Sequence, residues 1–493
     1  MNNEHQEKYT KEDFVPKSKT SDHSEEEYVP TIGLEIHAEL KTATKMFCAS
    51  ANVPHAHEPN THVCPVCMGH PGTLPAVNKK AVESVIKVGI ALGGNIATYT
   101  EFDRKNYFYP DIPKGYQISQ YAYPLVSGGS LLDVAITRVH LEEDTARSIH
   151  DQGDTSLVDY NRAGVPLMEL VTEPVIHDAK TASNFAKELQ LLLRTLGVSD
   201  AQMEIGQMRV EANISVGRGG VLGTKVEVKN LNSFKSVESA IQFEIARHKE
   251  VLAEGGKIVQ ETRGWDQDKQ KTFSQRKKES SHDYRYFPDP DIPKIQTDII
   301  SDFNISRLNE IMPELPSNKR IKYINLGLTI NDADTIVGNI DAAEFFEKVL
   351  CLLTTPESLK LAANYLISDL FSVISEDTHR TWEKASASTF GGLMTLIERG
   401  SITSRVAKDL LSEVVFESKD AALLIAERGL GKRDSADLMT VVDSIILEQQ
   451  KVVLEYKAGK LPALQFLIGQ AMRLTKGSGD PDSLRKLFIE RIG

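Results

Sequence analysis

The stretch TIGLEIHAELKTATK, residues 31–45, alternates apolar and polar residues so regularly that its first part can bury its apolar side chains only as a β-strand. A strand over residues 32–40 places Gly33, Glu35, His37 and Glu39 on one face and only apolar side chains on the other. Carboxylate and imidazole groups in a row are ligands that a hard divalent cation takes beside phosphate oxygens. A half-exposed strand whose polar face is simply solvated explains the pattern equally well.

The composition is typical of a soluble protein with more than one domain. The chain has 493 residues, more than one hydrophobic core usually supports, so two or three domains are expected. With 57 Lys and Arg against 69 Asp and Glu, the net charge of −12 gives no overall basic field for nucleic acid. Any contact with RNA must therefore be local.

The features that direct a protein out of the cytoplasm are not seen in this sequence, so a cytoplasmic location is expected. Residues 1–28 are polar and charged, without the apolar core of a signal peptide, and are expected to form a disordered tail. No apolar run is long enough to span a membrane. The four cysteines, three of them within residues 48–67, do not form the pattern of a secreted disulfide framework.

Three cysteines are candidate zinc ligands. Cys64 and Cys67 form a C-x-x-C knuckle, which lets two thiolates reach one tetrahedral zinc, and Cys48 is a third candidate. Ser50 stands where a second knuckle needs a cysteine, which counts against zinc. The fourth ligand would have to be water or one of His55, His57, His62 and His70. Three reduced cysteines on a packed loop are the alternative.

The segment EFDRKNYFYPDIPKGYQISQY, residues 101–121, is rich in aromatic residues, proline and glycine, and is predicted to be an ordered loop that lines a cleft. Arg104 and Lys105 are candidates for neutralising phosphates, and Tyr107 and Tyr109 for stacking on a base or ribose. Aromatic rings that fill a core beneath the loop are the alternative.

Acidic residues recur in two later strands. HLEEDTA contains Glu142, Glu143 and Asp144 in succession, and alternation sends Glu142 and Glu143 to opposite faces without showing which one faces a site. A solvated acidic edge is the alternative. In DYNRAGVPLMELVTEP, Glu169 lies in an apolar run, where a buried carboxylate needs a metal or an arginine as partner.

From about residue 318 the alternating pattern gives way to helical periodicity. The basic triplet at residues 276–278 is expected to be a solvated face or a phosphate contact. Residues 421–493 hold 11 basic and 9 acidic side chains, so this end repels a polyanion least. We expect a tail at 1–28, a first domain at 29–300, a helical domain at 301–419 and a helical tail domain at 420–493.

Eight segments follow one another in an order that points to one family: IGLEIHAELKT, CPVCMGHPGTLPAVN, FDRKNYFYPDIPKGYQISQ, HLEEDTA, DYNRAGVPLMELVTEP, VEVKNLNSF, QETRGWD and SHDYRYFPDPDIP. They resemble the B subunit of aspartyl/glutamyl-tRNA(Asn/Gln) amidotransferases. The resemblance implies an α+β fold, with a mixed or antiparallel sheet in a cradle domain, then an all-α domain and a small helical tail that holds the tRNA elbow. It also implies a cytoplasmic complex with an amidase (A) subunit and a small C subunit.

By this resemblance the chain is an ATP-dependent carbon–nitrogen ligase with glutamine as amido donor. It would phosphorylate the side-chain carboxylate of mischarged Glu-tRNA(Gln), Asp-tRNA(Asn) or both, and amidate it with ammonia from the amidase subunit. The implied catalytic residues are Glu35, His37, Glu142, Glu143 and Glu169, and the implied Mg²⁺ ligands are Glu35, His37, Glu143 and Glu169. The residues chosen for contact with ATP or the acyl phosphate are Arg104, Lys105, Asn161 and Arg162. A non-catalytic RNA-binding scaffold that retains these acids is the competing hypothesis.

Overall fold

The computed structural model describes residues 28–152, 155–277 and 281–493. It divides into two units, Met1–Pro313 and Glu314–Gly493, which are considered separately. The first is built on a mixed β-sheet and the second is helical, so the predicted α+β fold class is confirmed. The first unit extends beyond residue 300 to Pro313. The boundary expected at residue 419 stays a prediction. Except for Tyr28, the predicted tail lies outside the described residues, as does Lys278 of the basic triplet.

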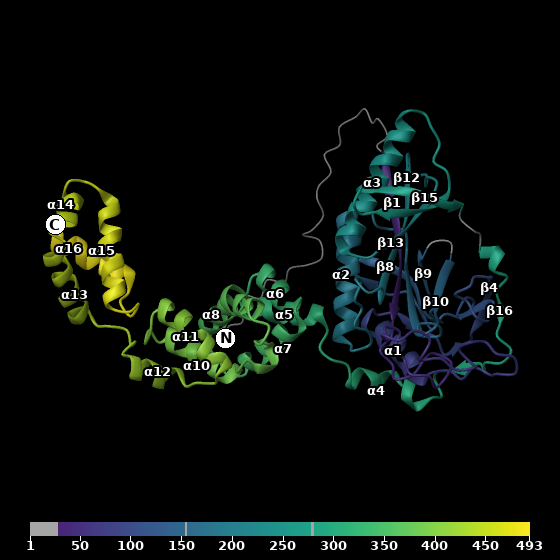
Figure 1. Cartoon of the computed structure of the whole chain (residues 1–493), viewed down its shortest axis with the longest axis horizontal. Coiled ribbons are helices and arrows are strands. Elements are labelled where there is room, and N and C mark those ends of the chain that lie inside the picture. The colour runs from purple at the N-terminus through teal and green to yellow at the C-terminus, as the bar shows by residue number, and fades with distance from the viewer. Residues whose placement is uncertain (1–27, 153–154, 278–280) are drawn as a thin grey trace, which may run out of the picture. The chain divides into compact units, whose positions relative to one another are not determined.

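A ten-stranded sheet forms the centre of the first unit (Figure 1). Its strand order is β15-β14-β13-β12-β1-β11-β8-β6-β2, with β7 on β8. Its strands are β1 (Val29–Glu39), β2 (Asn95–Ile96), β6 (Val126–Ser127), β7 (Ser130–Leu131), β8 (Val134–Glu143), β11 (Pro166–Thr172), β12 (Met208–Gly217), β13 (Val226–Leu231), β14 (Glu261–Asp266) and β15 (Lys271–Lys277). Only β13 and β14 pair in parallel among these strands. The strand predicted over residues 32–40 is thus confirmed, and it lies between β12 and β11.

One face of this sheet is apolar and covered by helices. On β1 the side chains of Ile32, Leu34, Ile36 and Ala38 are at most 1% exposed. Helices α2 (Ala179–Thr195) and α3 (Phe234–Ala253) lie side by side along the sheet (Figure 1) and contact β1 and β12, while α1 (Lys79–Ala91) packs on β8. Because side chains alternate along a strand, burying this face leaves the polar residues of β1 on the opposite face.

A small three-stranded sheet adjoins β8 and carries part of the aromatic segment. It contains β16 (Phe287–Pro288), β4 (Asp103–Asn106) and β5 (Tyr116–Ser119), in that order. Gln120, directly after β5, accepts a hydrogen bond from the Leu141 amide of β8. The remaining elements are β3 (Tyr99–Thr100) with β17 (Ile295–Gln296), β9 (Arg147–Gln152) with β10 (Thr155–Asp159), the 3-10 turns Ser281–Tyr284 and Ser301–Phe303, and α4 (Ile305–Glu310).

The second unit is helical in its described residues. Its α-helices are α5 (Pro316–Asn325), α6 (Ile330–Val337), α7 (Ile340–Leu350), α8 (Pro356–Tyr365), α9 (Phe371–Glu376), α10 (Ala387–Glu398), α11 (Ser404–Phe416), α12 (Ala421–Arg428), α13 (Ser435–Glu448), α14 (Gln450–Lys457), α15 (Leu461–Leu474) and α16 (Pro481–Ile492). A π-helical turn, Leu366–Leu370, and a 3-10 turn, Trp382–Lys384, complete it. Leu467, Leu484 and Phe488 lie at the centre of the core that α13 to α16 share. Among the helices described for this chain, none is both long and apolar enough to cross a membrane.

Candidate functional site

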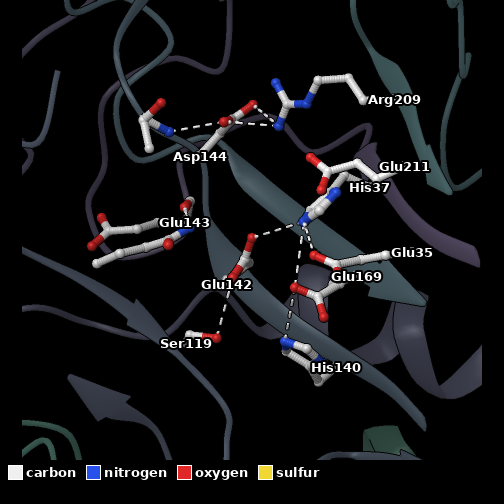
Figure 2. Close-up of polar contacts among 12 residues, drawn as sticks. Glu35, His37, Ser119, His140, Glu142, Glu143, Asp144, Glu169, Arg209 and Glu211 are labelled. Carbon is white, nitrogen blue, oxygen red and sulfur yellow. Dashed lines mark hydrogen bonds and ion pairs between the residues drawn. The ribbon is translucent and has the colours of Figure 1, made fainter. Parts of the chain in front are cut away.

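Three carboxylates from three neighbouring strands surround the ring of His37 (Figure 2). Nε2 of His37 lies 3.8 Å from Glu35 Oε1, 3.6 Å from Glu142 Oε1 and 3.3 Å from Glu169 Oε2. Glu169 Oε2 also lies 3.6 Å from Nε2 of His140. One ligand atom each from Glu35, His37 and Glu169 lies within 4.8 Å of the others, close enough to bind one cation together.

Strand register explains why these residues meet. His37 on β1 pairs with Glu169 on β11, and Glu169 pairs with His140 on β8. Paired residues of neighbouring strands point to the same face, and Glu142 joins them because it follows His140 by two residues. Glu142 and Glu169 are only 3% and 6% exposed, so their charges need a cation close by.

Burial and neighbouring charges shift the pKa values in this cluster. Burial and the charges of Glu169 and Glu211 raise the pKa of Glu35 to about 7. Burial opposes protonation of His37, but the hydrogen bond to Glu169 and the surrounding carboxylates raise its pKa to about 9. Burial lowers the pKa of His140 to about 4. At neutral pH, His37 therefore carries a proton that a bound cation would displace.

Glu143 does not join this cluster. Alternation along β8 turns it to the face opposite Glu142, and Figure 2 shows its carboxylate directed away from His37. Its Oε2 accepts a hydrogen bond from Lys114 Nζ at 2.7 Å, and its Oε1 accepts one from the Ile118 amide at 3.0 Å. There it lines a separate cavity of about 250 Å³. The geometry therefore gives Glu142 the position beside His37 that the sequence prediction gave to Glu143.

A half-buried arginine continues the polar row on the other side of His37. Arg209 on β12 is the register partner of His37, and its Nη2 donates to Asp144 Oδ1 at 2.9 Å. Nε of Arg162 lies 3.7 Å from Asp144 Oδ2. Against burial, Arg209 and then Arg162 lower the pKa of Asp144, which stays ionised. Positive charge therefore lies directly beside the carboxylate cluster.

Arg162 also lines a cleft of about 370 Å³ together with His55 and Arg147, and Glu204 lies at the same cleft. The Arg162 side chain is held there by hydrogen bonds to the backbone, because its Nε and Nη2 donate to carbonyls of the 145–146 segment at 2.9 and 3.0 Å. Two guanidinium groups and an imidazole at one cleft favour an anion such as a phosphate. Of the residues predicted to contact a nucleotide, Arg162 is thus placed where such a contact can form.

Lys105 is placed beside the cluster from the other side. Its Nζ lies 4.9 Å from the ring centre of Tyr284 and 5.9 Å from that of Tyr107. Burial disfavours its charge, but the charge of Glu142 and other neighbours raises the pKa of Lys105 above its usual value. Lys105 therefore stays cationic.

Arg104 and Asn161 are engaged within the protein. Arg104 Nε donates to Asp289 at 2.7 Å and Nη2 donates to Asp291 at 2.9 Å. Asn161 is fully buried, and its Oδ1 accepts a hydrogen bond from the His62 amide at 2.8 Å. Both residues shape loops around the site. Their predicted contact with a nucleotide stays a prediction.

The three predicted zinc ligands come together. One sulfur each from Cys48, Cys64 and Cys67 lies within 4.8 Å of the others, and no histidine joins this group among the described residues. Ser50 Oγ lies 3.9 Å from Cys67 Sγ, and the buried Lys45 Nζ lies 3.8 Å from it. A hydrogen bond from Cys48, with Lys45 nearby, lowers the pKa of Cys67 to about 4 despite burial. The group thus offers a thiolate, but only three sulfurs.

Sequence analysis missed the polar residues of β12 and β13. Glu211 is the register partner of Glu35, and carboxylate oxygens of Glu35, Glu211 and Glu227 lie within 4.8 Å of one another. Lys229 Nζ lies 2.7 Å from Glu211 Oε2. MRVEANISV and TKVEVKN alternate with the same period as the first strand, which was the available signal. The pairing of β12 with β1, and of β13 with β12, carried the missing information.

Comparisons with known proteins agree with this architecture. The family described as the GatB/GatE catalytic domain matches residues 30–301, and the family described as the GatB domain matches residues 344–492. The fold and site thus belong to a catalytic domain of the GatB/GatE class followed by a GatB helical domain.

Relatives that are named as the B subunit of aspartyl/glutamyl-tRNA(Asn/Gln) amidotransferase match almost the whole chain. A protein of Thermus thermophilus is 45% identical over 474 residues, which cover 94% of this chain and 99% of the relative. Those of Carboxydothermus hydrogenoformans and Persephonella marina are 40% and 41% identical, with 94% of this chain and 99% or more of each relative covered. The chain belongs to the family of aspartyl/glutamyl-tRNA(Asn/Gln) amidotransferase B subunits, as its eight segments predicted.

Proposed function

We propose that this chain activates and amidates the side-chain carboxylate of mischarged Glu-tRNA(Gln), Asp-tRNA(Asn) or both. In the first step a carboxylate oxygen attacks the γ-phosphorus of ATP, and ADP leaves. In the second step ammonia attacks the carbonyl carbon of the acyl phosphate, inorganic phosphate leaves, and the amide forms. The first step is needed because a carboxylate has no leaving group that ammonia can displace.

The convergence of Glu35, His37, Glu142 and Glu169 at one point supports this proposal most directly. Buried carboxylates and an imidazole suit Mg²⁺, and these four residues would hold it. Mg²⁺ supplies neutralisation of the phosphate oxygens during phosphoryl transfer.

Cationic side chains on both sides of the cluster have complementary tasks. We assign Arg162, with Arg147 and His55 at the same cleft, to the phosphates of ATP. We assign Lys105 to the carboxylate being activated, because it lies on the face of the small sheet that carries Ser119, which donates a hydrogen bond to Glu142. Arg162 with its cleft neighbours, and Lys105, would each hold a negatively charged reactant beside the carboxylate cluster. Without these cations the carboxylates would repel that reactant.

The proposal includes the partners implied by the family. An amidase subunit would supply ammonia from glutamine, a small C subunit would complete the complex, and residues 420–493 would hold the tRNA elbow. A cytoplasmic location and zinc at Cys48, Cys64 and Cys67 are also part of this proposal.

The test replaces Glu169 with glutamine and compares it with a matched change at Glu173, which directly follows β11 and binds Thr137 Oγ1 at the sheet surface. Glu169→Gln should reduce ATP-dependent formation of the acyl phosphate at least about 100-fold, while tRNA binding stays at the wild-type level. Glu173→Gln should leave both unchanged. Normal turnover of Glu169→Gln would leave the RNA-binding scaffold as the better description.

A further inference from the structure

Exposed aromatic rings gather in one place on the first unit. The exposed Phe and Tyr side chains of the described residues are Phe108, Tyr109, Tyr121, Tyr123, Phe273, Phe287 and Phe466. All but Phe273 and Phe466 lie in or directly beside the small sheet β16-β4-β5. Phe108 is 81% exposed, far more than structural packing requires. Aromatic surface collected in this way indicates a binding site.

Ring contacts join five tyrosines into a continuous row, here called the tyrosine array. Tyr109 and Tyr107 lie 5.9 Å apart between ring centres, Tyr107 and Tyr284 are also 5.9 Å apart, and Tyr284 and Tyr286 are 6.1 Å apart. Tyr286 then stacks on Tyr121 at 4.2 Å with an angle of 8° between the rings. The array therefore combines segments that are far apart in the sequence.

The backbone that carries this array is fixed. Asn106 Nδ2 donates to the carbonyls of Tyr284 and Arg285 at 3.2 and 2.9 Å. Arg285 has a φ of 45°, in the left-handed region, and lies between the tyrosines at 284 and 286. A rigid array loses little conformational entropy when a ligand binds to it.

The array faces the carboxylate cluster. Lys105 and Ser119 share one face of the small sheet, because Asp103 pairs with Ser119 and Lys105 follows Asp103 by two residues. On this face Ser119 Oγ lies 3.2 Å from Glu142 Oε2, and the Lys105 ammonium lies over the Tyr284 ring. A ligand stacked on the array is therefore adjacent to the site where the carboxylate is activated.

We propose that the tyrosine array and Phe108 bind the unpaired 3′-terminal nucleotides of the RNA substrate by stacking on their bases. The inference rests on the proposed function, which requires the aminoacyl end of the RNA to reach the carboxylate cluster. A row of several rings with a cation suits consecutive bases of a single strand, whereas one adenine needs only one or two ring faces. The exposed Arg285 is positioned to meet the phosphodiester groups.

The test is a binding cycle with the full chain and no ATP. Affinity is measured for uncharged tRNA with its complete 3′ end and for the same tRNA lacking its unpaired 3′-terminal nucleotides. Phe108→Ala combined with Tyr109→Ala should weaken binding of the complete tRNA about tenfold or more and leave the shortened tRNA unaffected. Phe108→Trp should retain the wild-type affinity. Phe273→Ala removes a ring on β15 that is about as exposed as Tyr109, 45% against 47%, and should change neither affinity.

Equal weakening for both RNAs, or no weakening for either, would overturn the inference. In a separate steady-state assay of the same double variant, an increase in the KM for ATP together with unchanged RNA affinity in the binding cycle would do so as well, because it would assign the rings to adenine. The binding cycle contains no ATP and no chemical step, so a failure of the phosphorylation proposal would appear in turnover and leave this cycle intact.

Discussion

His37 and Glu169 face each other across β1 and β11, with Nε2 of His37 3.3 Å from Oε2 of Glu169. The contact gives the imidazole a permanently charged neighbour, because His140 and His37 hold the pKa of Glu169 well below its usual range even though it is buried. Without a bound cation the protonated His37 therefore neutralises part of the negative charge of the cluster. A divalent cation and this proton compete for one position.

Binding of Mg²⁺ to the full chain should therefore release protons. With a pKa of about 9 for His37 and about 7 for Glu35, more than one proton should be released per ion at pH 7. Affinity should rise with pH, by about tenfold per unit for each proton displaced, until His37 is neutral. Calorimetry in buffers of different ionisation enthalpy measures this number. His37→Asn should lower it by about one, and His177→Asn, at an exposed site, should not. A buffer-independent heat would contradict the assignment.

The contact between Ser119 and Glu142 predicts a graded effect on activity. Ser119 Oγ lies 3.2 Å from Glu142 Oε2 and acts on the reaction only by positioning that carboxylate. Glu142→Gln should lower kcat for acyl-phosphate formation about 100-fold. Ser119→Ala should lower it only about tenfold, because a single hydrogen bond to the Glu142 carboxylate is lost while the carboxylate itself remains, and Ser119→Thr should restore it. Single-turnover assays measure both. A larger loss for Ser119→Ala than for Glu142→Gln would show that the serine has another role.

The stability of the first unit should depend on a buried charge outside the site. The side chain of Glu244 on α3 is 0% exposed and lies 2.7 Å from Arg247 Nη2 and 3.3 Å from Arg263 Nε. Against burial, His248 and Arg247 with Thr272 lower its pKa from 4.5 to about 2. Because the folded-state pKa is depressed, this stabilisation is present above about pH 4.5 and is lost as pH falls towards 2.

Glu244→Gln should accordingly reduce the free energy of unfolding by about 3 kcal/mol at pH 7. The difference from wild type should shrink as the pH is lowered from 4.5 towards 2. Urea unfolding of a Trp382→Phe background, in which Trp265 on β14 reports the first unit, measures this directly. Glu250→Gln, exposed on the same helix, should change stability by less than about 0.5 kcal/mol. A pH-independent difference would mean that the effect is steric.

The sequence predicted the parts of this fold that depend on local periodicity. Strict alternation in residues 32–40 predicted both the strand and its two faces. Alternation also separated Glu142 from Glu143, but it could not show which one lies beside His37. The answer depends on which face of β8 is covered by helices, because the residue on the opposite face is the one that meets His37. Tertiary packing decides which face is covered.

Register between distant strands could not be predicted either. Arg209 and Glu211 flank the cluster because β12 pairs with β1, and nothing local to MRVEANISV specifies that pairing. The same limit applies to Lys45, which was not expected beside the cysteines. A lysine that is 0% exposed signals a partner only once its burial is known.

The last prediction concerns the cysteine group. Three sulfurs converge, and Ser50 Oγ lies 3.9 Å from Cys67 Sγ, where a fourth thiolate would complete a tetrahedral site. Ser50→Cys should therefore raise zinc affinity at least about tenfold, measured as zinc retained by the full chain during dialysis against a graded chelator. Cys48→Ser in the Ser50→Cys background should abolish the gain, because it returns the group to three sulfurs. Equal retention by wild type and Ser50→Cys would show that water or the serine already completes the site, or that Lys45 keeps zinc out of both.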